Sequence, residues 1–161
     1  MTLRRSVAAV ALLLAAPVLS SCGVGFNEQT DLPYNPSAGV DDRSGTVNVL
    51  NALVVSGTDG SGTVIATLVN EDQTHADKLR SVTGAGADST LKVTTSGPTA
   101  VPAGGILNLA TDSGIAARGT RVVPGNLVEI TFSFNRAESI TVKAPVVSHD
   151  NPVYADVKVP S

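Results

Sequence analysis

The stretch Val128-Glu129-Ile130-Thr131-Phe132-Ser133-Phe134-Asn135 carries the clearest structural signal in the sequence. Apolar residues occupy every second position, and polar residues stand between them. A period of two residues places the two sets of side chains on opposite faces of a β-strand. We therefore expect a strand with one buried face here. Phe132 and Phe134 should anchor the core, because aromatic side chains bury a large apolar area.

Segments of the same kind precede and follow this strand, and turn residues separate them about every ten positions. Strands are expected at residues 46–55, 63–70, 78–82, 90–94, 106–109 and 139–144, while residues 115–118 suit either a strand or a loose turn. The segment 46–55 is apolar on both faces, and no segment has a helical period. The pattern predicts an all-β domain over residues 44–147, an immunoglobulin-like antiparallel β-sandwich of seven to eight strands.

The N-terminal residues 1–21 have the composition of a secretory signal peptide. Arg4 and Arg5 precede an apolar run of about 13 residues, which is shorter than the ~20 that a spanning helix needs. Leu19-Ser20-Ser21-Cys22 then resembles a bacterial lipobox, in which the cysteine receives a diacylglycerol and becomes the first residue of the mature protein. We predict lipidation at Cys22, and hence a lipid-anchored protein on the extracytoplasmic face of the cell membrane.

Two segments outside the predicted domain lack a regular apolar pattern. Residues 22–43 are rich in polar residues, proline and glycine and predict a flexible linker, and residues 148–161 predict a C-terminal tail. Removal of the signal takes Arg4 and Arg5 from the 11 basic residues and leaves 14 acidic ones. This acidic balance argues against nucleic acid as a partner, since phosphate binding needs a basic face.

The sequence shows no arrangement typical of a catalytic site. Its two histidines lie near acidic residues, His75 between Asp72 and Asp77 and His149 beside Asp150. No Gly-x-Ser-x-Gly motif marks a nucleophile. No glycine-rich segment has the lysine or the strand–turn–helix context of a nucleotide site. We therefore predict no catalytic residues and a protein that is not an enzyme.

Four segments together resemble the PCuAC copper-chaperone family in their order and spacing. They are Asn70 to Leu79, Val101-Pro102-Ala103-Gly104-Gly105 with Leu107 and Leu109, Pro124 to Phe134, and Ser139 to Val146. The resemblance covers residues 46–147 and implies a cupredoxin-like β-sandwich. It also implies copper(I) bound by a histidine on the strand after the polar loop and by a His-x-Met pair after the Pro-Ala-Gly strand.

This chain does not retain the ligands that the resemblance implies. Leu91-Lys92-Val93 and Gly114-Ile115-Ala116-Ala117-Arg118 occupy the expected positions, and Met1 is the only methionine. Copper(I) prefers thioether and thiolate ligands. We predict no metal or other cofactor at these positions. The domain would be a non-enzymatic binding or accessory module that contacts an envelope protein or a small ligand. The alternative is a copper metallochaperone with an altered site built from His75, His149 and carboxylates.

Overall fold

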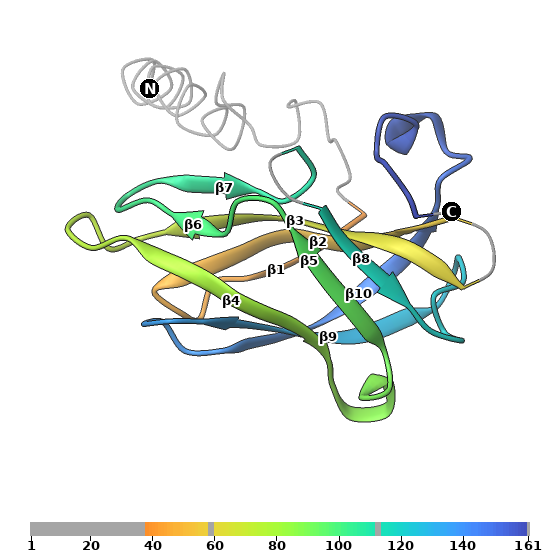
Figure 1. Ribbon diagram of the computed structural model, residues 1–161, viewed down its shortest axis with the longest axis horizontal. Coiled ribbons are helices and arrows are strands. Elements are labelled where there is room, and N and C mark those ends of the chain that lie inside the picture. The colour runs from red at the N-terminus through yellow and green to blue at the C-terminus, as the bar shows by residue number, and fades with distance from the viewer. Residues whose placement is uncertain (1–37, 58–59, 112–113, 161) are drawn as a thin grey trace, which may run out of the picture. The chain divides into compact units, whose positions relative to one another are not determined.

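The computed structural model describes residues 38–57, 60–111 and 114–160, and all of them belong to one of the two compact units of the chain, Ser37–Ser161. Nearly all regular structure in these residues is β (Figure 1). The strands are β1 (Val40–Asp42), β2 (Val47–Ser56), β3 (Ser61–Asn70), β4 (Asp77–Gly84), β5 (Lys92–Ser96), β6 (Ala100–Val101), β7 (Ile106–Asn108), β8 (Gly114–Arg118), β9 (Leu127–Phe134) and β10 (Ile140–Ser148). Two 3-10 turns accompany them, η2 (Gly86–Asp88) and η3 (Pro152–Tyr154). The described residues contain no helix with the length and hydropathy of a membrane span.

The strands form one sheet in the order β5-β8-β3-β2-β10-β9-β4-β6, with β1 added beside β2 and β7 beside β3. The sheet curls, since β4 also contacts β5 from the other end of the path. The alternation of 128–135 is confirmed in β9, whose residues Val128, Ile130, Phe132 and Phe134 are all buried. The all-β prediction is therefore confirmed.

Two details differ from the predicted sandwich. The described residues hold ten strands rather than seven or eight, because β1 and β6, which have three and two residues, are too short to show a pattern. The sheet is also not wholly antiparallel. The end of β10 pairs in parallel with the end of β2, with Val147 opposite Val55. The parallel pairing joins segments about 90 residues apart, which local periodicity does not report.

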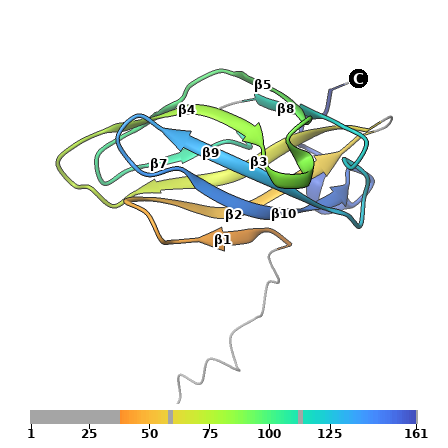
Figure 2. The same ribbon diagram turned by 90° about the horizontal axis from the view of Figure 1, so that it is seen from below.

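The linker predicted over residues 22–43 is wrong at its C-terminal end, because residues 40–42 form β1. This short strand pairs with Val49–Ala52 of β2, and Figure 2 shows the two side by side. Asn51 of β2, whose backbone is in the left-handed region at φ 51°, makes two hydrogen bonds that hold this short strand. Its side-chain oxygen accepts a hydrogen bond from the amide of Gly39, and its own amide donates to Asp41. Residues 1–37, which include the predicted signal peptide, Cys22 and most of the predicted linker, lie outside the described residues.

The tail predicted over residues 148–161 begins in β10 and then packs on the sheet. After Ser148 the chain turns through η3 and crosses the outer face of β2 and β3, the face opposite the main core. Leu53, Val55 and Ile65 are buried there under Val147 and the tail residues Tyr154, Val157 and Val159. On the inner face, Val54, Val64, Ala66 and Leu68 belong to the main core instead. The domain thus has two separate apolar clusters, and the tail completes the second.

Candidate functional site

The first candidate site is the pair of strands β5 and β8, where the family resemblance implies copper ligands. The two segments are about 20 residues apart in the sequence, and the structure makes them direct neighbours (Figure 1). Lys92 lies opposite Arg118, Val93 opposite Ala117, and Thr94 opposite Ala116. The fold therefore brings the implied ligand positions together.

The side chains at these positions do not suit copper(I). Ala117 and Ile115 are buried, and they and Val93 join the main core. Lys92 and Arg118 are both exposed on the other face. Neither segment offers a thioether, a thiolate or an imidazole, the groups that bind copper in proteins. Two cationic side chains directly opposite each other also oppose the approach of a metal cation. Copper(I) does not fit this pair of strands.

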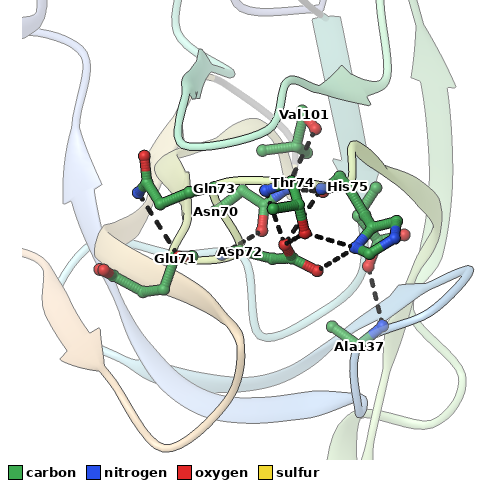
Figure 3. A network of polar contacts seen from close by, with 9 residues as sticks. Asn70, Glu71, Asp72, Gln73, Thr74, His75, Val101 and Ala137 are labelled. Carbon is green, nitrogen blue, oxygen red and sulfur yellow. Dashed lines mark hydrogen bonds and ion pairs between the residues drawn. The ribbon is translucent and has the colours of Figure 1, made fainter.

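The second candidate site is the polar loop between β3 and β4, shown in Figure 3. Asn70, at the end of β3, is 2% exposed and organises the loop. Its side-chain amide donates to the carbonyl of His75 at 2.9 Å, and its side-chain oxygen accepts from the amide of Asp72 at 3.0 Å. A buried amide that satisfies two backbone groups fixes the path of the loop.

The carboxylate of Asp72 binds two later residues of this loop, Thr74 and His75. It accepts from the amide and the hydroxyl of Thr74, at 2.8 and 2.7 Å, and from the amide of His75 at 3.0 Å. The Nδ1 atom of His75 lies 2.9 Å from the other carboxylate oxygen. The bonds from Thr74, above all from its hydroxyl, hold the pKa of Asp72 far below its ordinary value. These bonds therefore favour the ionised form of the Asp72 carboxylate.

The arrangement of Asp72, Thr74 and His75 is not that of a nucleophile and its base. In a catalytic triad the carboxylate and the hydroxyl bind opposite nitrogens of the imidazole. Here both approach Nδ1, because the Thr74 hydroxyl lies 2.7 Å from that atom. The carboxylate orients the ring through Nδ1. His75 also lines a cavity of about 150 Å³, together with Thr46 and Arg136.

Asp77, at the start of β4, holds this loop against the turn between β9 and β10. Its carboxylate accepts from the amides of Lys78, Asn135, Arg136 and Ala137, at 2.6 to 3.2 Å. Burial raises the pKa of Asp77, but the four backbone bonds together lower it more, so the net pKa is below its ordinary value. Asp77 thus acts as a structural acceptor for a hairpin turn.

The second histidine lies far from the first. His75 follows the end of β3 that pairs with the start of β2, whereas the amide of His149 donates to Ser56 at the end of β2. Ten residues of strand separate these ends, roughly 30 Å at about 3.3 Å per residue. The Nε2 atom of His149 donates to the carbonyl of Val157, 3.0 Å away. His75 and His149 do not share a site, and no cluster of three metal-binding side chains occurs among the described residues.

Comparisons with known proteins agree with this architecture. No protein-family model and no curated protein matches the sequence. Solved structures do match. The copper-bound PCuAC domain from PmoF2 aligns with a TM-score of 0.57 and 16% identity over 68% of this chain and 98% of that domain. The apo PCuAC domain from PmoF1 gives 0.55 and 18% over 68% and 99%, and the apo PmoF2 domain gives 0.55 and 17% over 69% and 97%. The domain has the PCuAC fold.

The sequence indicates the PCuAC-like segments but not the roles of Asn70, Asp77 and Thr63. Asn70 begins one of those segments and Asp77 lies near His75 in sequence, and both are buried. A signal was present for Asn70, since Asn at a strand end commonly binds backbone groups two or three residues away. Asp77 carries no such signal, because the amides of Asn135, Arg136 and Ala137 that it binds are 58 to 60 positions away. Thr63, which binds the tail, carries no such signal, because its partner Lys158 is 95 positions away.

Proposed function

We propose that this chain is a membrane-anchored envelope lipoprotein whose PCuAC-like domain acts as a non-enzymatic binding module without the copper(I) site of that family. One observation carries the proposal. The β5–β8 pairing that brings the implied ligand positions together has apolar side chains on one face and Lys92 and Arg118 on the other. An intact scaffold with such side chains supports binding of something other than copper.

Copper titration of the purified full chain tests the loss of the metal site. With a copper(I) chelator as competitor, we expect no stoichiometric binding at micromolar free copper. His75→Ala and His149→Ala should leave the titration unchanged, because the two rings lie roughly 30 Å apart by strand length. Stoichiometric binding that His75→Ala abolishes would contradict the proposal. It would instead support the metallochaperone with an altered site.

The lipid anchor has a separate test in cells. Metabolic labelling with an alkyne fatty acid should label the wild-type chain and leave the Cys22→Ser variant unlabelled. A mass spectrum of the N-terminal peptide should show a diacylglycerol on the sulfur of Cys22. An unlabelled wild-type chain recovered in the soluble fraction would show that Leu19-Ser20-Ser21-Cys22 is not a lipidation signal.

A further inference from the structure

The C-terminal segment lies in a groove on the outer face of β2 and β3. Leu53 and Val55 of β2 and Ile65 of β3 form its apolar floor, and none of the three is more than 7% exposed. Val157 and Val159 pack onto this floor, and Lys158 between them is exposed. Side chains of this segment therefore alternate between the groove and solvent, as in an extended strand.

Two buried hydroxyl groups bind the backbone of this segment. The Thr63 hydroxyl donates to the carbonyl of Lys158 at 2.6 Å, and the Ser61 hydroxyl donates to the carbonyl of Pro160 at 3.1 Å. Ser61 and Thr63 are 2% and 7% exposed. The two donors are two residues apart on β3, and the two acceptors are two residues apart on the tail. The spacing of these hydrogen bonds therefore matches the two-residue repeat of an extended chain.

These contacts resemble those by which proteins recognise extended peptides, in which hydrogen bonds to the peptide backbone supply affinity and pockets for alternate side chains supply selectivity. Here the hydrogen-bond donors are the side-chain hydroxyls of Ser61 and Thr63. The tail does not fill the groove completely. A cavity of about 270 Å³ borders Gly57, Val159 and Pro160, and another of about 490 Å³ borders Ser96, Asp156 and Lys158. Space therefore remains on both sides of the seated segment.

We propose that this groove is a peptide-binding site that the tail of the chain occupies in cis. Its ligands are extended segments in which two β-branched residues flank a polar one and precede a proline, as in Val157-Lys158-Val159-Pro160. A partner protein with such a segment, long enough to reach the flanking cavities, displaces the tail. This inference names a partner for the proposed binding role, but it depends on the outer face of β2 and β3 and not on the β5–β8 strands.

The test uses the full chain and a labelled peptide, Ala-Asp-Val-Lys-Val-Pro, with the sequence of residues 155–160. The double variant Val157→Ser/Val159→Ser weakens the tail and leaves the groove intact. Fluorescence anisotropy should show at least tenfold tighter peptide binding by this variant than by the wild type. The reason is that a tethered tail competes at an effective concentration of about a millimolar. Adding Thr63→Val should weaken that binding roughly three- to tenfold, the effect of one lost hydrogen bond.

A second peptide controls for non-specific apolar binding, with serine in place of both valines. It should not bind the double variant. The proposal is overturned if the double variant keeps the circular dichroism of the wild type but binds neither peptide, or if it binds both equally. Light scattering of the wild type shows whether the groove holds the tail of the same chain or that of a second copy. If the wild type is a dimer and the valine peptide dissociates it, the tail of a second copy fills the groove. The assignment to a different partner would then be wrong. Copper titration reports on the proposed function independently.

Discussion

The loop at residues 70–77 and the tail at residues 149–160 contain the same pair of residue types, but different contacts hold each segment in place. Each contains a histidine close to an aspartate. In the loop the aspartate binds the histidine ring, with Asp72 2.9 Å from Nδ1 of His75. In the tail Asp150 binds the Ser148 hydroxyl instead, and the ring of His149 binds a backbone carbonyl. Proximity in sequence therefore did not determine which groups meet.

The two segments also depend on different forces. Buried polar groups, Asn70 and Asp77, fix the loop by accepting and donating hydrogen bonds to backbone. An apolar floor of three residues and two hydroxyls fixes the tail. Removing one member of a buried hydrogen-bond network lowers stability strongly, because the partner groups stay buried without a hydrogen bond and without water. Apolar contacts weaken in proportion to the area lost. The loop should accordingly be the more rigid of the two.

The largest effect is expected at the anchor of the loop, Asp77→Ala. The substitution removes the acceptor of the amides of Lys78, Arg136 and Ala137, whereas the amide of Asn135 still donates to the carbonyl of Lys78. The free energy of unfolding should therefore fall on the order of 3 kcal/mol. Urea denaturation measures this loss. Asp72→Ala is the matched control in the same loop, and its loss should be smaller because the amides it serves are close to solvent. Equal losses for the two variants would show that Asp77 is not the anchor.

A smaller effect is expected in the tail, for Tyr154→Ala. Tyr154 is partly buried against the second apolar cluster, and losing that contact should lower the free energy of unfolding by roughly 1–2 kcal/mol. The adjacent Val153 is 78% exposed. Val153→Ala should therefore change the same quantity by less than about 0.5 kcal/mol. If Val153→Ala lowered the free energy of unfolding as much as Tyr154→Ala, the proposal that Tyr154 packs on the sheet while Val153 faces solvent would be contradicted.

Acid should weaken the loop before it weakens the tail. The pKa of Asp77 is lower in the folded domain than the value of about 3.9 expected for an unfolded chain. Its contribution is therefore fully present above about pH 4 and is lost as the pH falls through the lower, folded pKa. Urea unfolding between pH 6 and 2.5 measures this. In Asp77→Asn the free energy of unfolding should fall less steeply with decreasing pH than in the wild type. In Tyr154→Ala it should fall as steeply as in the wild type. Parallel curves for Asp77→Asn and the wild type would contradict the assignment.

The sequence predicted the parts of the fold that depend on local periodicity. The alternation in β9 and the apolar segments of β2 and β3 are readable because each contains its own pattern. The parallel pairing of β10 with β2 is not local, and neither is β1, whose three residues carry no period. One clue was present, however. A strand that is apolar on both faces needs cover on both, and Leu53 and Val55 are covered by the tail.

Less of the candidate sites was predictable. The resemblance located the implied ligand positions correctly in space, since β5 and β8 pair. The two histidines could not be placed, because the position of His75 depends on the buried side chain of Asn70 and that of His149 on the return of the tail. Both depend on contacts between residues whose separation the sequence pattern does not reveal.

The smallest expected effect compares the two histidines directly. His149→Ala removes the hydrogen bond from Nε2 to the Val157 carbonyl, which closes the tail segment, and should cost about 1 kcal/mol. Because that cost falls on opening of the tail and not on global unfolding, limited proteolysis should cut residues 149–160 several times faster than in the wild type. His75→Ala should leave this cleavage rate unchanged, since the ring of His75 binds Asp72 and Thr74 within its own loop. Faster cleavage in His75→Ala would mean that the loop and the tail are coupled through β2, whereas a difference confined to His149→Ala would show that they are independent.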